Sequence, residues 1–270
     1  MKHERIYLDP NNDRVFIDTY VANSRSRVRD AMLVIPGGGY SAVCTEREGE
    51  PIALAFFAKG MNCFVLNYRV TKDNRYPDQL IDASRAILYI KQHADELCIN
   101  PDRVFTVGFS AGGHLSGSCA ILHKDAKVLE ALGIKKGDNK PRASVLGYPV
   151  VSAFGKTHLG SFEMLLGKPI NEMTIEEKTA LSLECNVDAD SSPVFIWHTS
   201  RDLLVPIEGS LKLADAYYNV GTPVALHIYP YGDHGAALAN EITECGKADY
   251  VQPLAECWVD EVARWIKTLE

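Results

Sequence analysis

Ser110, Asp202 and His234 are residues whose types and order along the chain could together perform acyl transfer. Ser110 lies in the run Gly-Phe-Ser-Ala-Gly at 108–112, directly after the apolar run 104–107. In a Gly-x-Ser-x-Gly run a strand turns sharply into a helix and exposes the serine hydroxyl. Glycine is needed at both ends because strand and helix approach too closely for a Cβ atom. The run therefore predicts a nucleophile at Ser110 rather than an ordinary turn serine.

The acid and the base of this chemistry are predicted at the ends of later strands. Asp202 and His234 follow the apolar runs 194–197 and 225–229. Parallel strands bring their carboxyl ends to the same edge of a sheet, so both side chains are expected near Ser110. The order Ser, Asp, His is the one that serines on this kind of turn use. We predict that His234 accepts the serine proton while Asp202 holds the imidazole tautomer and stabilises its positive form.

Competing assignments remain for the base and for the acid. His198 ends the predicted strand 194–197 and is a rival base, although it would precede the acid along the chain. Asp233 adjoins His234 and would have difficulty bending back onto its imidazole. Two further carboxylates are alternatives for the acid, namely Glu208 and Asp190.

The run Pro-Gly-Gly-Gly-Tyr at 36–40 could supply hydrogen-bond donors that these three side chains lack. It follows the apolar run 32–35, and glycines let backbone amides approach a ligand without an intervening side chain. Attack of a serine on a carbonyl creates an oxyanion, which preorganised N–H groups stabilise. We expect these donors to be the N–H groups of Gly38, Gly39 and Ala111, where the start of a helix adds its positive dipole end.

The elements that must position these residues alternate along the chain. Short apolar, β-branched runs predict parallel strands at 32–35, 63–66, 104–107, 143–146, 194–197 and 225–229. Apolar residues spaced by three or four predict a helix over 78–97 and another over 254–269, whose tryptophans should pack against the sheet. The runs 5–8 and 15–20 predict antiparallel edge strands joined by a turn at 9–13. This alternation predicts an α/β fold with a doubly wound, mostly parallel sheet and helices on both faces.

The segment 152–192 interrupts the alternation with short helical pieces, one of them opened by a capping box at Thr174. An insertion of this length between strands is usually functional or covers a site, so we expect substrate contacts there. We interpret it as a small cap within one domain spanning 1–270. Tyr40 and His198 are further candidate substrate contacts, because each adjoins a predicted site segment.

Composition argues against several classes of partner. The formal net charge is −7, and no basic run is present of the kind that binds a phosphate backbone, so no nucleic-acid partner is expected. The longest apolar stretch, 52–58, is far shorter than the roughly 20 residues that cross a bilayer. The first residues lack the apolar core of a signal peptide. We expect no membrane association, and oligomeric state is left open.

The cysteines indicate a reducing compartment. There are seven of them, an odd number without any Cys-x-x-Cys pair, which fits free thiols better than a disulfide framework or a zinc site. This usage predicts a cytoplasmic location. Cys44 lies near the glycine run, and we interpret it as a small apolar loop residue rather than a catalytic thiol. No metal or other cofactor is expected.

With these residues in place, the chain resembles the α/β-hydrolase superfamily over nearly its whole length. It is most similar to bacterial esterases of the acetyl esterase and acetyl-xylan esterase type, through the runs at 36–40, 108–115 and 197–199. The resemblance assigns the same nucleophile, acid, base and oxyanion amides. It implies removal of short acyl groups, often acetyl, from carbohydrate-like alcohols without a cofactor. Hormone-sensitive-lipase-like relatives carry His where this chain has Pro36, so the larger acyl substrates of that branch are not implied.

The leading hypothesis is a serine carboxylester hydrolase that forms an acyl-enzyme with a small ester, such as an acetylated sugar. An amide or peptide hydrolase of the formamidase or dipeptidase kind is the enzymatic alternative, because the same triad serves both reactions. A binding protein on a hydrolase scaffold is the non-catalytic alternative. That last alternative predicts a broken triad, whereas all three residue types are present in order.

Overall fold

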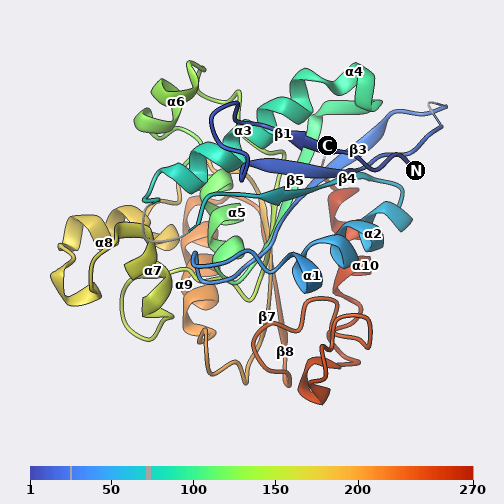
Figure 1. Ribbon diagram of the computed structural model, residues 1–270. Coiled ribbons are helices and arrows are strands. Elements are labelled where there is room, and N and C mark those ends of the chain that lie inside the picture. Colours follow the sequence, from blue (N-terminus) through green and yellow to red (C-terminus); the bar gives the residue numbers. More distant parts are fainter. Residues whose placement is uncertain (25, 71–73, 270) are drawn as a thin grey trace.

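A central sheet organises the molecule. The computed structural model describes residues 1–24, 26–70 and 74–269, and within them eight strands form one sheet. These strands are β1 (Arg5–Tyr7), β2 (Phe16–Tyr20), β3 (Arg29–Ile35), β4 (Asn62–Asn67), β5 (Ile99–Phe109), β6 (Ser144–Gly147), β7 (Val194–Thr199) and β8 (Val224–Tyr229). They lie in the order β1-β2-β4-β3-β5-β6-β7-β8 (Figure 1). Neighbours from β4 to β8 are parallel, which confirms the predicted mostly parallel sheet.

The first two strands form the antiparallel part of the sheet, as the early apolar runs predict. β1 pairs antiparallel with β2, and β2 pairs antiparallel with β4. The prediction that both are edge strands is wrong for β2, which lies between β1 and β4. Its side chains explain this position, because Ile17 and Tyr20 are buried in the core on opposite faces of the sheet.

Helices cover both faces of the sheet (Figure 1). Buried residues of α2 and α10 pack on one face, while those of α3, α5 and α9 pack on the other. Their bounds are α1 (Thr45–Glu48), α2 (Glu50–Ala58), α3 (Asp78–Gln92), α4 (Ala94–Leu97), α5 (Ala111–Ile121), α6 (Ala126–Leu132), α7 (Leu159–Leu166), α8 (Ile175–Leu181), α9 (Glu208–Val220) and α10 (Trp258–Ile266). Short 3₁₀ turns lie at Ile170–Glu172, Leu183–Cys185 and Ala248–Tyr250. This is the doubly wound arrangement that the alternation predicts.

The helix predicted over 78–97 is interrupted at His93. There the backbone leaves helical geometry, with φ −101° and ψ 22°, so α3 ends at Gln92 and α4 begins at Ala94. The His93 ring stacks on Tyr89 with ring centroids 3.9 Å apart. This local packing accompanies the break, which the apolar spacing does not reveal.

The last helix is shorter than predicted but buries one indole as expected. α10 begins at Trp258, and Leu254 lies in the preceding turn with 60% of its surface exposed. Trp258 is fully buried and stacks on Trp197 of β7, with centroids 5.3 Å apart. Trp265 packs on the edge of the same core, against Phe195.

The central strands are buried on both faces, and their parallel pairing brings their carboxyl ends to one edge of the sheet. Leu33 and Ile35 of β3 join the core under α3 and α5, whereas Met32 and Val34 join the core under α2 and α10.

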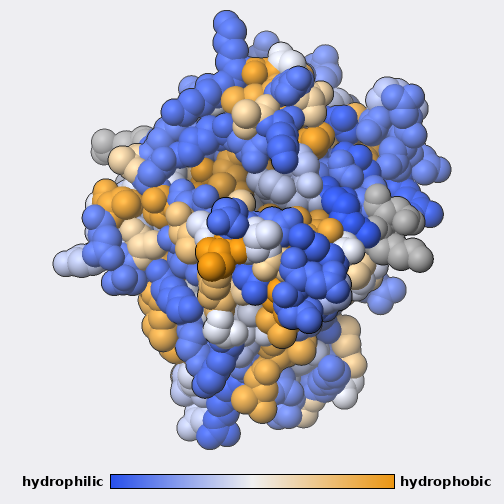
Figure 2. Space-filling view, turned by 90° about the vertical axis from the view of Figure 1, so that its left-hand side faces the viewer, coloured by the Kyte–Doolittle hydropathy of each residue, from blue (hydrophilic) through white to orange (hydrophobic). Residues whose placement is uncertain are grey.

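Figure 2 views the side on which α7 and α8 lie, where hydrophilic residues cover most of the surface and hydrophobic ones form scattered patches. None of the helices in the described residues has the length and apolar character needed to cross a membrane.

Candidate active site

Ser110 occupies a strained turn between β5 and α5. Its backbone has φ 53° and ψ −120°, a conformation that non-glycine residues rarely adopt and that is typical of functional positions. A Cβ atom on Gly108 would lie 2.0 Å from the Gly112 carbonyl oxygen, and one on Gly112 would lie 2.2 Å from that of Ile35. Both glycines are therefore required sterically, for the reason that the sequence predicts.

The structure brings together the three side chains of the predicted triad. The Ser110 hydroxyl donates to His234 Nε2 at 2.8 Å, and His234 Nδ1–H donates to Asp202 Oδ2 at 2.6 Å. Because an ionised carboxylate can only accept, Nδ1 carries the imidazole proton and Nε2 is free to accept from the serine. Asp202 follows β7 and His234 follows β8, so the carboxyl ends of two parallel strands supply the two partners.

Asp202 is buried, and both of its carboxylate oxygens accept hydrogen bonds from protein groups. Its Oδ1 accepts from the backbone N–H groups of Leu204 and Val205 at 3.0 and 2.8 Å. Its Oδ2 accepts from His198 Nε2 at 3.3 Å as well as from His234. Burial alone would raise the pKa of Asp202, but the hydrogen bonds from the two imidazoles outweigh it and hold the pKa well below its usual range. The carboxylate is therefore ionised wherever the protein is folded at ordinary pH.

The glycine run forms a loop with backbone donors near Ser110. Gly38 and Gly39 have φ 130° and 62°, in the region that favours glycine, and both line the cavity that contains Ser110. Across the described residues, the N–H groups of Gly38, Gly39 and Ala111 have no hydrogen-bond acceptor. The N–H of Gly37 donates to Glu48 Oε2 at 2.8 Å and is therefore occupied. Three unpaired donors thus remain near the serine.

A cavity of about 280 Å³ opens over these groups. Its walls combine the serine, the imidazole and the glycine loop with side chains from three other segments. The lining residues are Gly38, Gly39, Ser41, Cys44, Arg47, Glu48, Ser110, His158, Leu204 and His234. Sequence reasoning missed five lining residues, namely Ser41, Arg47, Glu48, His158 and Leu204. Ser41 adjoins the predicted glycine run and His158 belongs to the 152–192 segment, whereas no sequence signal pointed to the other three.

The two candidate substrate contacts lie elsewhere. Tyr40 is 1% exposed, and its hydroxyl donates to His114 Nδ1 at 2.7 Å. His198 is fully buried, with Nε2–H donating to the Val205 carbonyl at 2.9 Å. Neither side chain lines the cavity. The prediction that these two side chains contact substrate is therefore wrong. Both rings point into the core, where they form hydrogen bonds with residues next to the site.

Protonation states inside the cavity limit the chemistry of its other groups. Burial lowers the pKa of His158, and the neighbouring His234 imidazole adds to this effect, so His158 is neutral at pH 7. Burial together with Glu48 raises the pKa of the Cys44 thiol, which disfavours the thiolate. Within the described part of the chain, no group of three or more His, Cys, Asp or Glu could hold a metal ion.

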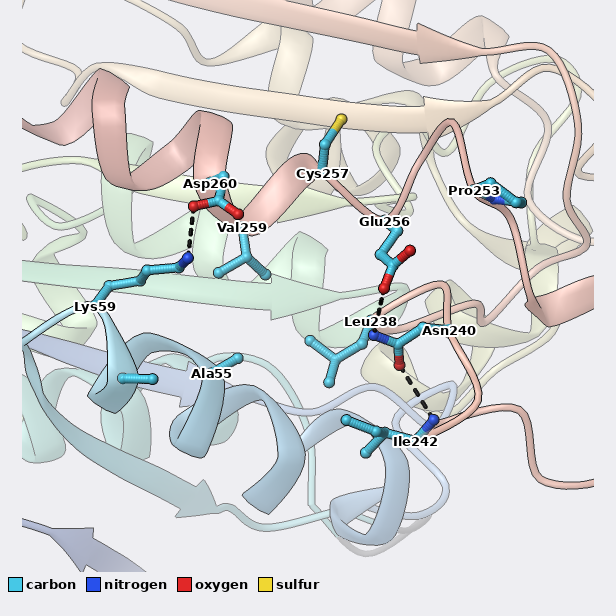
Figure 3. Close-up of a pocket in the computed structure, with 11 residues that line it drawn as sticks. Ala55, Lys59, Leu238, Asn240, Ile242, Pro253, Glu256, Cys257, Val259 and Asp260 are labelled. Atoms are coloured by element: carbon cyan, nitrogen blue, oxygen red, sulfur yellow. Dashed lines mark hydrogen bonds and ion pairs between the residues drawn. The ribbon is translucent and has the colours of Figure 1, made fainter.

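A larger cavity, about 490 Å³, has a different character (Figure 3). It lies between α2, α10 and the loop before α10, where Lys59 pairs with Asp260 at 2.5 Å and Asn240 donates to Glu256 at 3.2 Å. Its lining residues are Ala55, Ala58, Lys59, Leu238, Asn240, Ile242, Pro253, Glu256, Cys257, Val259 and Asp260. No serine or histidine is among them, so a hydroxyl nucleophile with an imidazole base is absent from this lining.

The sheet order, the strained serine turn and the loops that follow β3, β7 and β8 define an α/β hydrolase. Residues 17–217 match the family described as BD-FAE. The chain belongs to this family of α/β-hydrolase esterases.

Known proteins similar to this chain include two curated relatives and a solved structure. Endo-1,4-beta-xylanase B of Butyrivibrio fibrisolvens is 38% identical over 79% of this chain and 33% of that protein. An acetylxylan esterase of Xylanibacter ruminicola is 29% identical over 76% of this chain and 40% of that protein. The chain thus spans well under half the length of these relatives. The crystal structure of an acetyl ester-xyloside bifunctional hydrolase from Caldicellulosiruptor lactoaceticus is 32% identical, covers 98% of this chain and 96% of its own, and has a TM-score of 0.82.

Proposed function

We propose that this protein is a serine esterase that removes short acyl groups, chiefly acetyl, from carbohydrate esters. The observation that carries the proposal is the hydrogen-bonded series from Ser110 through His234 to Asp202, beside a glycine loop with unpaired N–H groups. A nucleophile, a base, an orienting acid and oxyanion donors in one cavity are the parts that acyl transfer needs.

In the proposed mechanism, Ser110 Oγ attacks the ester carbonyl carbon while His234 Nε2 accepts the hydroxyl proton. The N–H groups of Gly38, Gly39 and Ala111 stabilise the oxyanion of the tetrahedral intermediate, and Asp202 stabilises the imidazolium. The C–O bond to the alcohol then breaks, and His234 returns the proton to the departing alkoxide. Water attacks the acyl-serine with the same base, which releases the carboxylic acid and restores the serine.

The size and chemistry of the cavity support a small, polar substrate. About 280 Å³ is at the lower end of ligand pockets, which suits an acetyl group with part of one sugar better than a long acyl chain. The walls offer the Ser41 hydroxyl, the Arg47 guanidinium and the neutral His158 imidazole for hydrogen bonds to sugar hydroxyls. The names of the acetylxylan esterase and of the acetyl ester-xyloside hydrolase support the same substrate class.

We also propose that the 152–192 segment belongs to this site as a small cap within one domain of residues 1–270. His158 lies at the start of that segment and lines the cavity, and its Nδ1 lies 2.9 Å from Ser161 Oγ. This contact fixes the ring, which supports a role in orienting substrate.

Replacement of the nucleophile tests the reaction. Ser110→Ala should lower turnover of p-nitrophenyl acetate by about a millionfold, because triad members act as a unit. Ser24→Ala, which changes an exposed serine after β2 that does not line the cavity, is the matched control and should retain wild-type turnover. Near-normal turnover by Ser110→Ala would refute the proposal, and failure of a fluorophosphonate to label wild-type Ser110 would favour a binding protein.

A substrate panel tests the proposed specificity. Acetylated xylo-oligosaccharides should be hydrolysed with higher kcat/KM than butyrate or longer esters, because the cavity limits acyl length. Aryl-formamides and peptides belong in the same panel, since the triad could also cleave amides. Preference for an amide over the matched acetate ester would replace the esterase assignment with the amidase alternative.

A further inference from the structure

Glu48 is a buried carboxylate at the base of the candidate active site. It is the last residue of α1, the short helix that follows the glycine loop, and is only 2% exposed. Its Oε2 accepts from the Gly37 N–H at 2.8 Å, and its Oε1 accepts from the Tyr148 hydroxyl at 2.8 Å. The Arg47 guanidinium lies 3.6 Å from the same Oε1 and supplies a countercharge. Such a charge is tolerated in the interior only when it is paired in this way.

Tyr148 extends the contacts of Glu48 to the segment that bears His234. Its ring meets the His234 imidazole edge-on, with centroids 5.0 Å apart and planes at 72°. Its hydroxyl accepts from the Ala237 N–H at 3.0 Å, three residues after the proposed base. Burial, reinforced by Glu48, raises the pKa of Tyr148 well above its usual value, so the hydroxyl keeps the proton that it donates.

These contacts join two parts of the site that are far apart in the sequence. One carboxylate oxygen holds the glycine loop at Gly37, and the other reaches the base loop through the Tyr148 hydroxyl. Glu48 is therefore a direct connection between the segment of the oxyanion donors and the segment of His234. For preorganised donors, a displacement of about 1 Å can cost roughly a hundredfold in rate.

We propose that Glu48 is a positioning residue that sets the oxyanion loop and the base loop relative to each other. The inference rests on the proposed esterase function. Glu48 does not itself transfer protons in this scheme, because both oxygens already accept hydrogen bonds and the side chain is almost inaccessible. Its effect reaches the reacting atoms through the Gly37 backbone and through Tyr148.

Two conservative variants break the contact between Glu48 and Tyr148 from its two sides. Glu48→Gln retains an amide oxygen that can accept from Gly37 but places an NH₂ group toward Tyr148, which removes the acceptor for the phenol. Tyr148→Phe removes the hydroxyl and keeps the ring. Glu46→Gln, an exposed carboxylate on the same helix, is the matched control. Thermal unfolding verifies that each variant is folded.

The readouts are kcat and KM for p-nitrophenyl acetate and the inhibition constant of a phenylboronic acid, which forms a tetrahedral adduct on an active serine. We expect Glu48→Gln and Tyr148→Phe each to lower kcat by about 10- to 100-fold and to weaken boronate binding by a similar factor, with KM within about threefold of wild type. The double variant should lose no more than the worse single variant, because both changes break one connection. Glu46→Gln should match wild type.

Several outcomes would overturn the inference. An active wild type with unchanged kcat in Glu48→Gln would do so, as would losses that multiply in the double variant. If Glu48→Gln does not fold, Tyr148→Phe alone decides, and wild-type kcat and boronate affinity in that variant would refute the role. An inactive wild type would refute the proposed function and this inference together, so the two failures are distinguishable.

Discussion

Two buried carboxylates, Asp202 and Glu48, support the candidate site in different ways. Asp202 accepts four hydrogen bonds, from two imidazoles and two backbone N–H groups. Glu48 accepts two, from one backbone N–H and one phenol. Asp202 bonds directly to His234, the imidazole that becomes positive during the proposed reaction. Glu48 accepts hydrogen bonds only from neutral donors, and the Arg47 guanidinium lies 3.6 Å from it.

The two carboxylates therefore have different proposed roles: Asp202 stabilises the charge of the imidazolium, and Glu48 fixes the positions of the loops. A carboxylate beside a developing imidazolium stabilises a charge that appears only in the transition state, which raises kcat directly. A carboxylate behind a loop stabilises the same arrangement before and during the reaction, so its influence passes through the positions of other groups. We therefore expect kcat to depend on the charge of Asp202, and to depend on Glu48 through the positions of the backbone segments that it contacts.

Among the variants that test this comparison, Asp202→Asn should have the largest effect. The amide NH₂ would favour the wrong tautomer of His234, so kcat for p-nitrophenyl acetate should fall by about 10⁴-fold. The comparison predicts that this loss exceeds that of Glu48→Gln by at least tenfold, and kinetics of both purified variants would measure it. Equal losses would show that the two carboxylates have the same kind of role.

A backbone change on the glycine loop should have the next largest effect. Gly38→Ala would place a Cβ atom 2.2 Å from the Ala42 carbonyl oxygen at φ 130°, so the loop must move and kcat should fall by about 100- to 1000-fold. In Gly39→Ala the nearest atom, on His158, lies 3.6 Å away, so only the strain of alanine at φ 62° remains, and the loss should be smaller, about tenfold. A similar kcat in both variants would contradict the proposed sensitivity to geometry.

His114, a neutral residue that contacts Tyr40 at the end of the glycine loop, should have the smallest effect. We expect this effect in the free energy of unfolding rather than in kcat. His114 accepts from the Tyr40 hydroxyl and donates to the Leu181 carbonyl at 2.8 Å, and burial lowers the pKa of His114 to about 4. Its unfolded pKa is about 6.5, so between pH 6.5 and 4 the unfolded chain binds a proton that the folded protein excludes. The stability present above pH 6.5 is therefore lost on acidification, by about 3 kcal/mol at pH 4.

The matched variant for this effect is His114→Gln, whose amide can accept from Tyr40 and donate to Leu181 without titrating. Urea unfolding at pH 7 and pH 4 should give a decrease in unfolding free energy that is about 3 kcal/mol smaller in the variant than in wild type. Parallel decreases in the two proteins would show that this imidazole is not kept neutral by the fold.

Sequence reasoning was successful where local rules constrain the backbone. The residue order around Ser110, the glycines on either side of it and the strand ends before Asp202 and His234 follow from steric and topological requirements within short segments. These requirements predict the sheet and the meeting of the three side chains. The helix break at His93 and the inner position of β2 were not predictable in the same way, because both depend on packing between segments.

The positions of the side chains around the triad also depend on packing between distant segments. Tyr40 and His198 adjoin site segments in sequence, yet tertiary packing turns both rings into the core. Glu48 carries no motif, and its partner Tyr148 is 100 residues away, so only the folded chain brings them together. The sequence by itself determined where the proposed reacting groups meet, because turn sterics and strand order act locally. Only the tertiary structure decided which groups hold them in place and line the cavity, because burial and side-chain direction arise from contacts between distant segments.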